Sequence, residues 1–210
     1  MQTIPRTIVA SPLMRRGGFG VYAGLVDVGV QRRMLAEAVG LMARASDSRV
    51  DVSRDGQERG GEPARRLLTA SAGAEQRRFY WSPSTIAFLR SITHRSLQPT
   101  GGVGTYSYYA RPGDFLALHR DIVTCDVAVI TCLSDAPAGA PGGQLCLYPG
   151  RASEPIQAIR TTPSRGAERM KLAAGQTIVL YGGIVPHALL PVAAGQVRIV
   201  SVLCYRIPSA

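Results

Sequence analysis

Two histidines and one aspartate are the residues of this chain whose types and spacing best suit chemistry. His119 and Asp121 are separated by a single residue, and His187 follows further along the sequence. Two imidazoles and one carboxylate are the protein ligands of a mononuclear non-haem iron(II) site, in which further coordination positions stay open. Those positions can bind O2 together with a co-substrate that coordinates the metal through two of its oxygen atoms. The three residues therefore predict an iron(II) site that reacts with O2.

A buried positive charge is expected close to this site. Arg198 lies eleven residues after His187, inside the apolar segment QVRIVSVLCY. A guanidinium in such a segment needs an anionic partner. The partner could be a carboxylate of the protein, but we favour the far carboxylate of 2-oxoglutarate, held by the two-pronged guanidinium. Tyr109 lies ten residues before His119, on the expected strand that precedes the one with His119. Its hydroxyl could reach the same co-substrate, although a strand tyrosine often only packs.

The third histidine and the cysteines are expected to have no part in the chemistry. His94 falls in the helix-like segment SITHRSL, and we interpret it as an ordinary structural residue. The four cysteines lie in apolar segments without CxxC spacing, which predicts small buried apolar side chains and no zinc site: Cys125, Cys132, Cys146 and Cys204.

The first half of the chain, residues 1–99, is predicted to be helical and irregular. Apolar residues recur with helical spacing over residues 30–44. A second helix should start at Ser82-Pro83, a capping residue followed by a proline. The polar, glycine-rich stretch over residues 46–76 is expected to be a mobile loop or a lid over the substrate.

The second half, residues 100–210, is predicted to form the β-sheet core. Short β-rich runs alternate with Gly- and Pro-rich turns, namely TYSYYA, DFLALHRD, DVAVITCL, GQLCLYP, QTIVLYG and QVRIVSVLCY. Such spacing is typical of a double-sheet jelly roll of the cupin kind. On a strand, His119 and Asp121 would leave the same face. We therefore expect a mainly β protein with flanking helices, in a single domain spanning residues 1–210.

Composition restricts the class of protein further. Hydrophobic residues make up 46% and charged residues 18% of the chain, which indicates a globular protein. No apolar run approaches the roughly 20 residues that span a bilayer, and the first residues lack the order of a signal peptide, so we expect a cytoplasmic protein. The net charge of +10 comes almost entirely from dispersed arginines. They indicate a solvated surface or an acidic partner, such as a nucleic acid or a carrier protein.

The chain resembles the prolyl-hydroxylase-like branch of the 2-oxoglutarate/iron(II)-dependent dioxygenases. The resemblance covers about the C-terminal half of the chain. It rests on Tyr109 ahead of the HxD pair, on the segment Gly142-Gly143-Gln144-Leu145, and on the run from His187 to Val192 followed by Arg198. Val200 departs from the pattern, because many relatives have a small hydroxyl residue two places after the arginine.

The resemblance implies a double-stranded β-helix in which His119, Asp121 and His187 bind iron(II). It further implies that 2-oxoglutarate chelates the metal and meets Arg198. With an aspartate as third ligand, hydroxylation is the expected outcome, and desaturation or ring formation is the alternative. The expected substrate is an amino acid, a peptide or a small natural-product intermediate, free or bound to a carrier.

Two alternatives from other classes stay open. One is a nucleic-acid demethylase of the same superfamily, which the net charge favours. Against it, those enzymes have a second arginine six residues after the first, where this chain has Cys204, and Arg206 lies eight residues on. The other is a non-catalytic, cupin-like binding protein. Metal content and 2-oxoglutarate turnover separate it from an enzyme, and retention on DNA tests for the demethylase.

Overall fold

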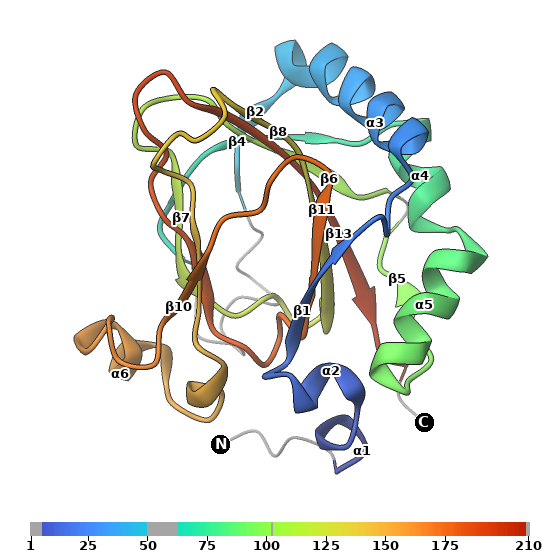
Figure 1. The fold of residues 1–210 in the computed structure, drawn as a ribbon, viewed down its shortest axis with the longest axis vertical. Helices are drawn as coiled ribbons and strands as arrows, with labels where there is room; N and C mark the ends of the chain where they lie inside the picture. Colours follow the sequence, from blue (N-terminus) through green and yellow to red (C-terminus); the bar gives the residue numbers. More distant parts are fainter. Residues whose placement is uncertain (1–5, 50–62, 102, 209–210) are drawn as a thin grey trace.

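The structure is a computed structural model that describes residues 6–49, 63–101 and 103–208. Within these residues the strands form two antiparallel sheets that face each other (Figure 1). The larger sheet has the order β1-β11-β8-β13-β6-β4-β2, with β5 paired to β13. Its strands are β1 (Phe19–Ala23), β2 (Ser46–Asp47), β4 (Leu68–Ser71), β5 (Gln98–Pro99), β6 (Thr105–Tyr109), β8 (Val127–Ala136), β11 (Gln176–Leu180) and β13 (Val197–Arg206).

The smaller sheet carries the metal-binding candidates. Its order is β10-β9-β12-β7-β3. Its strands are β3 (Arg65–Arg66), β7 (Phe115–His119), β9 (Leu145–Leu147), β10 (Glu168–Met170) and β12 (His187–Leu189). Together the two sheets make the double-stranded β-helix, or jelly roll, that the sequence predicts.

The longer helices cover the outer face of the larger sheet, whereas the short helix at residues 156–161 lies beside the smaller sheet (Figure 1). The helical elements are α1 (Arg6–Val9), α2 (Pro12–Arg15), α3 (Val28–Leu41), η1 (Met42–Arg44), α4 (Ala74–Tyr80), α5 (Pro83–Thr93), η2 (Pro149–Arg151) and α6 (Ile156–Thr161). Asp27 is the N-cap of α3, and its carboxylate accepts a hydrogen bond from the backbone amide of Gly29 at 2.8 Å. The Tyr108 hydroxyl fastens this helix to β6 by donating to the carbonyl of Ala38 at 2.7 Å.

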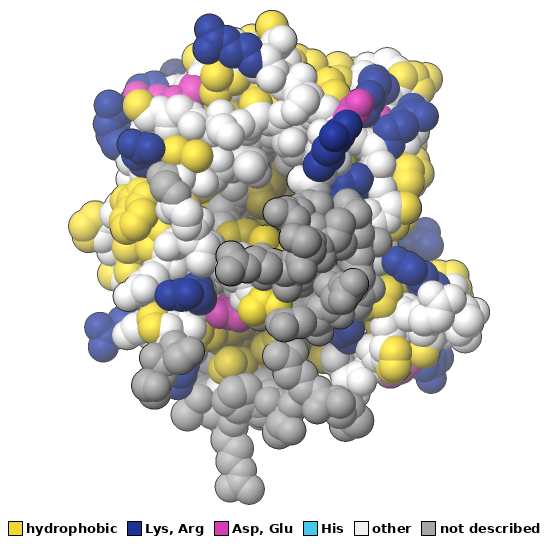
Figure 2. Space-filling model, turned by 180° about the vertical axis from the view of Figure 1, so that it is seen from behind, with side chains coloured by type: hydrophobic (Ala, Val, Ile, Leu, Met, Phe, Trp, Pro, Cys, Tyr) yellow, Lys and Arg dark blue, Asp and Glu magenta, His cyan; other side chains and the backbone are white. Residues whose placement is uncertain are grey.

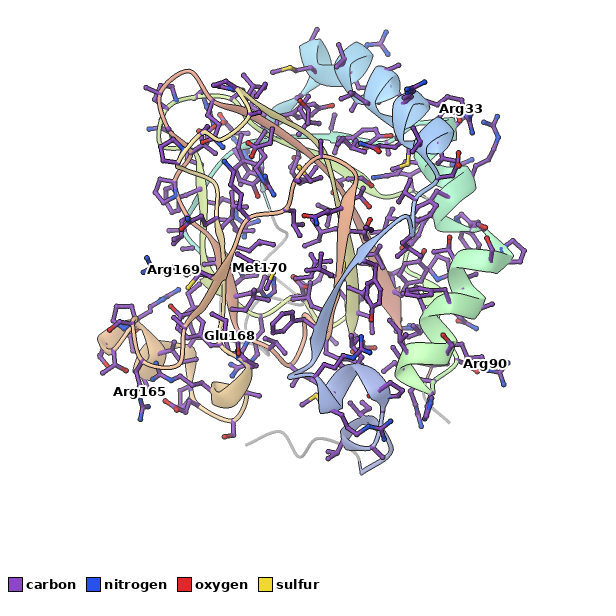
Figure 3. All side chains as sticks on the ribbon, in the orientation of Figure 1. Arg33, Arg90, Arg165, Glu168, Arg169 and Met170 are labelled. Carbon is purple, nitrogen blue, oxygen red and sulfur yellow. A yellow bond between two sulfur atoms is a disulfide. The ribbon has the colours of Figure 1, made fainter. Side chains whose placement is uncertain are left out.

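Strand alternation divides the apolar residues between two layers. On β6, Tyr106 and Tyr108 pack beneath the helices, whereas Tyr109 belongs to the cluster between the two sheets. On β10, Met170 points toward the interior and Arg169 away from it (Figure 3). The space between the sheets is where the candidate site lies.

The two predicted helices are confirmed, but residues 1–99 hold more structure than expected. The helix predicted at 30–44 is α3 with η1, and α5 begins at Pro83 after Ser82. The irregular stretch predicted over 46–76 is wrong where it is described, because β2, β3, β4 and the start of α4 fall within it. β3 pairs with β7, β4 with β6, and β2 with β4, and local residue patterns do not reveal this pairing. Residues 50–62 of the predicted lid lie outside the described residues.

The cysteine prediction is half right. Cys132 and Cys146 are buried free thiols, as expected. Cys125 and Cys204, by contrast, form a disulfide across a sequence separation of 79 residues. The fold brings them together because the loop before β8 runs beside the end of β13, where the amide of Asp126 donates to the carbonyl of Tyr205 at 3.0 Å. Among the described residues, no helix is long and apolar enough to cross a membrane.

The disulfide predicts the outcome of thiol labelling. In denaturant without reductant, alkylation should modify Cys132 and Cys146 only, because the other two sulfurs are bonded to each other. Prior reduction should raise the count to four, which serves as the control. Peptide mass spectrometry gives the labelled positions. Modification of Cys125 or Cys204 without reductant would contradict the assignment.

Candidate metal centre

Two neighbouring strands of the smaller sheet bring the histidines face to face. β7 ends at His119, β12 begins at His187, and the two residues are direct partners in the antiparallel pairing. Their rings lie 4.3 Å apart between centroids. The sequence did not predict β12, which is only three residues long. Strand pairing therefore fixes the separation of the two imidazoles.

Asp121 completes the cluster from just beyond the end of β7. Its Oδ1 lies 3.5 Å from Nε2 of His119 and 3.6 Å from Nε2 of His187. One ligand atom from each residue lies within 4.8 Å of the other two. The three residues predicted as ligands thus converge on one point, and both histidines are buried.

Backbone carbonyls set which nitrogen of each ring faces that point. Nδ1 of His119 lies 2.9 Å from the carbonyl of Ala117, and Nδ1 of His187 lies 2.9 Å from that of Val185. A carbonyl can only accept, so each Nδ1 carries the proton. Nε2 of both rings then keeps a free lone pair directed at Asp121, which is the arrangement a bound metal requires.

Burial keeps the second imidazole neutral. The pKa of His187 is lowered to about 4, first by burial and then by the neighbouring His119, with Asp121 opposing the shift. At neutral pH the ring therefore offers a lone pair rather than a second proton. This is the protonation state in which histidine binds metals.

The turn before β12 is built around the aspartate. The amide of Asp121 donates to the carbonyl of Gly182 at 2.8 Å. A Cβ on Gly182 would lie 1.7 Å from Oδ2 of Asp121, so only glycine leaves room for the carboxylate. Gly182 opens the turn GGIVP that precedes His187, and no role was predicted for it from the sequence. Its position just before the distal histidine was the available signal.

The side chain of Arg120 also holds this turn in place, by hydrogen bonds to backbone carbonyls. Its Nε donates to the carbonyl of Ile184 at 3.1 Å, and its Nη2 donates to the carbonyls of Ala152 and Glu154 at 2.8 Å each. Burial without a paired carboxylate among the described residues lowers the pKa of Arg120. Arg120, for which the sequence predicted no role, therefore fixes the segment that leads into His187.

The predicted arginine and tyrosine share a cavity with the three ligands. This cavity has a volume of about 330 Å³ and lies between the sheets. On the larger sheet Arg198 pairs directly with Tyr109 of β6 on one side and with Asp135 of β8 on the other. Directly paired residues project from the same face of a sheet. The structure thus joins all five predicted site residues, whereas His94 is exposed at the end of α5.

Arg198 belongs to a buried cluster with excess positive charge. Its side chain is 1% exposed, and its Nη1 lies 3.3 Å from Oδ2 of Asp135. The same oxygen lies 2.9 Å from Nζ of Lys171. The protein carboxylate considered as an alternative partner is therefore present, but two cations share it. Nε of Arg198 has no hydrogen-bond partner within the described chain. The cluster can accept a further anion.

Comparison with known proteins gives a match in fold. No protein-family model and no curated protein matches the chain. Among solved structures, a Pseudomonas putida prolyl-4-hydroxylase aligns with a TM-score of 0.66 and 15% identity, over 97% of this chain and 100% of the hydroxylase. The non-haem α-ketoglutarate-dependent epimerase SnoN, from nogalamycin biosynthesis, aligns with a TM-score of 0.71 and 16% identity, over 96% and 80%.

A third solved structure was determined with metal and co-substrate. HygX from Streptomyces hygroscopicus, with nickel and 2-oxoglutarate bound, aligns with a TM-score of 0.66 and 13% identity, over 99% of this chain and 88% of HygX. At such identities the likeness is one of fold. The predicted fold class is thus confirmed: the chain has the double-stranded β-helix of the 2-oxoglutarate/iron(II) oxygenases, including the prolyl-hydroxylase-like ones.

The geometry predicts which substitutions remove the metal. His119→Ala or His187→Ala deletes one of three protein ligands. Because outer-shell partners alone change metal affinity by about 10–100-fold, loss of a ligand should weaken iron(II) binding by more than about 100-fold. Iron stoichiometry after anaerobic reconstitution measures this. His94→Ala is the control and should keep full iron, whereas full iron in both ligand variants would refute the site.

The close approach at the turn gives an independent prediction. Gly182→Ala should push the Asp121 carboxylate out of place and weaken iron(II) binding by roughly 10–100-fold. Gly40→Ala is a matched control, because a Cβ there meets no atom within 4 Å. Iron affinity is measured by anaerobic titration, alongside thermal unfolding of each variant. Unchanged affinity in a folded Gly182→Ala protein would count against the placement of Asp121.

Proposed function

We propose that the chain is a 2-oxoglutarate- and iron(II)-dependent dioxygenase. It hydroxylates, or otherwise oxidises, an unactivated C–H bond of an amino acid, a peptide or a small natural-product intermediate. The observation that carries the proposal is one cavity holding two imidazoles, one carboxylate and a buried arginine. The solved structures of this fold that were compared include a hydroxylase and an epimerase, which supports the reaction class.

The donor set fits iron(II). Two imidazoles and one carboxylate that face a cavity, with no fourth ligand of this kind among the described residues, match the facial arrangement of non-haem iron oxygenases. His119, Asp121 and His187 would hold the metal. When bound, the metal and 2-oxoglutarate supply the oxidising chemistry with O2, which the protein side chains cannot supply themselves.

The cationic cluster fits the co-substrate. Arg198 would hold the far carboxylate of 2-oxoglutarate, because its Nε is unpartnered and Asp135 is shared with Lys171. Asp135 and Lys171 in turn fix the guanidinium, which also donates from Nη1 to the carbonyl of Leu172 at 3.2 Å. A fixed guanidinium binds a carboxylate with less loss of conformational freedom.

Tyr109 is suited to bind the same carboxylate. Its hydroxyl makes no hydrogen bond to the part of the chain that the structure describes. Burial raises the pKa of Tyr109, with Arg198 opposing the shift, so the hydroxyl stays protonated. We propose that it donates a hydrogen bond to 2-oxoglutarate.

Apolar side chains complete the cavity wall. Those that line it include Ile130, Leu145, Leu172, Leu189 and Val200. They limit the entry of water to the reacting atoms and strengthen the ionic contact to Arg198. Val200 makes this wall more apolar than a small hydroxyl residue would.

The net charge of +10 is the one observation that favours the nucleic-acid alternative, and the distribution of that charge does not support it. On the face shown in Figure 2, the described Lys and Arg side chains lie scattered, with hydrophobic and uncharged side chains between them. A continuous basic stripe is the usual footprint of nucleic-acid binding. We therefore keep a small-molecule or peptide substrate as the proposal.

The reaction class is tested by succinate formation. With iron(II), 2-oxoglutarate and O2, a panel of amino acids, peptides and carrier-bound substrates should include at least one that stimulates succinate release. Oxygen from ¹⁸O2 in the product would identify hydroxylation. Protein that binds iron and 2-oxoglutarate but releases no succinate with or without substrate would instead indicate a binding protein.

Arg198 gives the sharper prediction. Arg198→Ala should weaken 2-oxoglutarate binding roughly 30-fold or more, because losing one partner of a buried charged pair costs about 2–5 kcal/mol. Anaerobic titration, followed by the iron charge-transfer absorption, measures the affinity. Arg169→Ala serves as control, since Arg169 points away from the interior (Figure 3). An unchanged affinity in Arg198→Ala would show that another residue binds the far carboxylate of 2-oxoglutarate, with Lys171 the next candidate.

A further inference from the structure

Strand β13 presents one row of side chains to two adjoining hollows. Arg198, Val200, Val202 and Cys204 line the metal cavity, and Val202, Cys204 and Arg206 line an outer groove. Residues two apart on a strand share a face. One face of β13 therefore carries an arginine at each end of an apolar row.

The outer groove adjoins the metal cavity. Its volume is about 530 Å³. Four residues line both hollows, namely Thr105, Ile122, Val202 and Cys204. Ile122 directly follows Asp121, so the two hollows meet on the Asp121 side of the metal centre. The groove and the metal centre are therefore neighbours along β13.

Arg206 is the charged group of this groove. Its side chain is exposed, and its guanidinium makes no ion pair or hydrogen bond within the described chain, whereas its backbone pairs with that of Gln98. None of the described residues that line the groove is acidic. Two neighbouring polar groups are already engaged: the hydroxyl of Tyr80 donates to the carbonyl of Thr100 at 2.8 Å, and that of Thr100 donates to the carbonyl of Cys204 at 2.7 Å. The guanidinium thus offers its donors to a ligand.

We infer, resting on the proposed function, that the outer groove binds the anionic end of an elongated substrate at Arg206, while an apolar chain runs along β13 to the metal. The anion is a carboxylate or a phosphate. Cys204 is bonded to Cys125, whose sulfur lies 3.7 Å from Oδ2 of Asp121. Arg206 is two residues further, about 7 Å along the strand. The oxidised C–H bond therefore lies several carbon atoms from the anion.

Matched amphiphiles test the groove without knowledge of the natural substrate. Octanoate, octyl phosphate, octylammonium and octanol share one chain and differ in charge. Binding is followed by calorimetry and by the fluorescence of Trp81, the only tryptophan. Trp81 follows Tyr80, which lines the groove, and the two rings are in contact. The protein is the full chain loaded with nickel(II) and 2-oxoglutarate, so that Arg198 is occupied. Each titration is repeated on the chain alone.

The anionic probes should bind at least about fivefold more tightly than octanol, the gain expected for an exposed ion pair. Octylammonium should bind more weakly than octanol. Arg206→Gln should abolish the preference for the anions and leave octanol affinity unchanged, and Arg206→Lys should restore part of it. Arg169→Gln should behave as wild type. The order of octanoate and octyl phosphate identifies the preferred anion.

Two results would overturn the inference: equal affinity for charged and neutral probes, or a preference that survives in Arg206→Gln. Failure of the proposed function has a different signature. In that case 2-oxoglutarate fails to bind the nickel-loaded wild type, whereas the probe titrations on the chain alone still decide the role of Arg206. Arg206→Gln should itself retain 2-oxoglutarate affinity.

Discussion

The pairing of β12 with β7 is the constraint on which the site depends. β12 is only three residues long, yet its first residue, His187, lies directly opposite the last residue of β7, His119. Two hydrogen bonds hold the turn before β12: the amide of Asp121 donates to the carbonyl of Gly182, and the side chain of Arg120 donates to the carbonyl of Ile184. A slip of one residue would turn the histidine to the other face of the sheet. The ligand geometry therefore follows from strand register.

The opposite wall of the cavity depends on a charge imbalance. A lone guanidinium buried between sheets would be strongly unfavourable, and Asp135 offsets part of that cost. Because Lys171 shares the same carboxylate, the offset is incomplete and an anion is accommodated. β13 also carries Arg206, which lines the outer groove. Because Arg206 is exposed to solvent, its attraction for an anion is screened more strongly than that of Arg198.

Much of the site could be predicted from sequence because its chemistry is carried by few residue types. The chain has only three histidines, and an HxD pair with a distal histidine has few other uses. The β-rich runs between Gly- and Pro-rich turns predicted the jelly roll, and the apolar segment around Arg198 predicted a buried guanidinium. Tyr109 is adjacent to Arg198 as expected, and its contact with 2-oxoglutarate stays a prediction.

What the sequence did not reveal depends on contacts between distant residues. Among residues 46–71, β3 and β4 form because β7 and β6 offer them partners, and β2 pairs with β4 in turn, although the stretch that contains them is polar and glycine-rich. Cys125 and Cys204 were interpreted as apolar residues because spacing alone cannot pair them. Asp135 and Gly182 have no local motif, and their roles appear only when the sheets are assembled.

A crystal structure of the anaerobic protein with iron(II) and 2-oxoglutarate tests the central claim most directly. Anomalous scattering at the iron edge locates the metal independently of the refined protein. The account predicts one iron bound by Nε2 of His119, Nε2 of His187 and the Asp121 carboxylate, with the far carboxylate of 2-oxoglutarate on Arg198. Iron bound elsewhere, or a co-substrate whose far carboxylate leaves Arg198 paired only with Asp135, would contradict it.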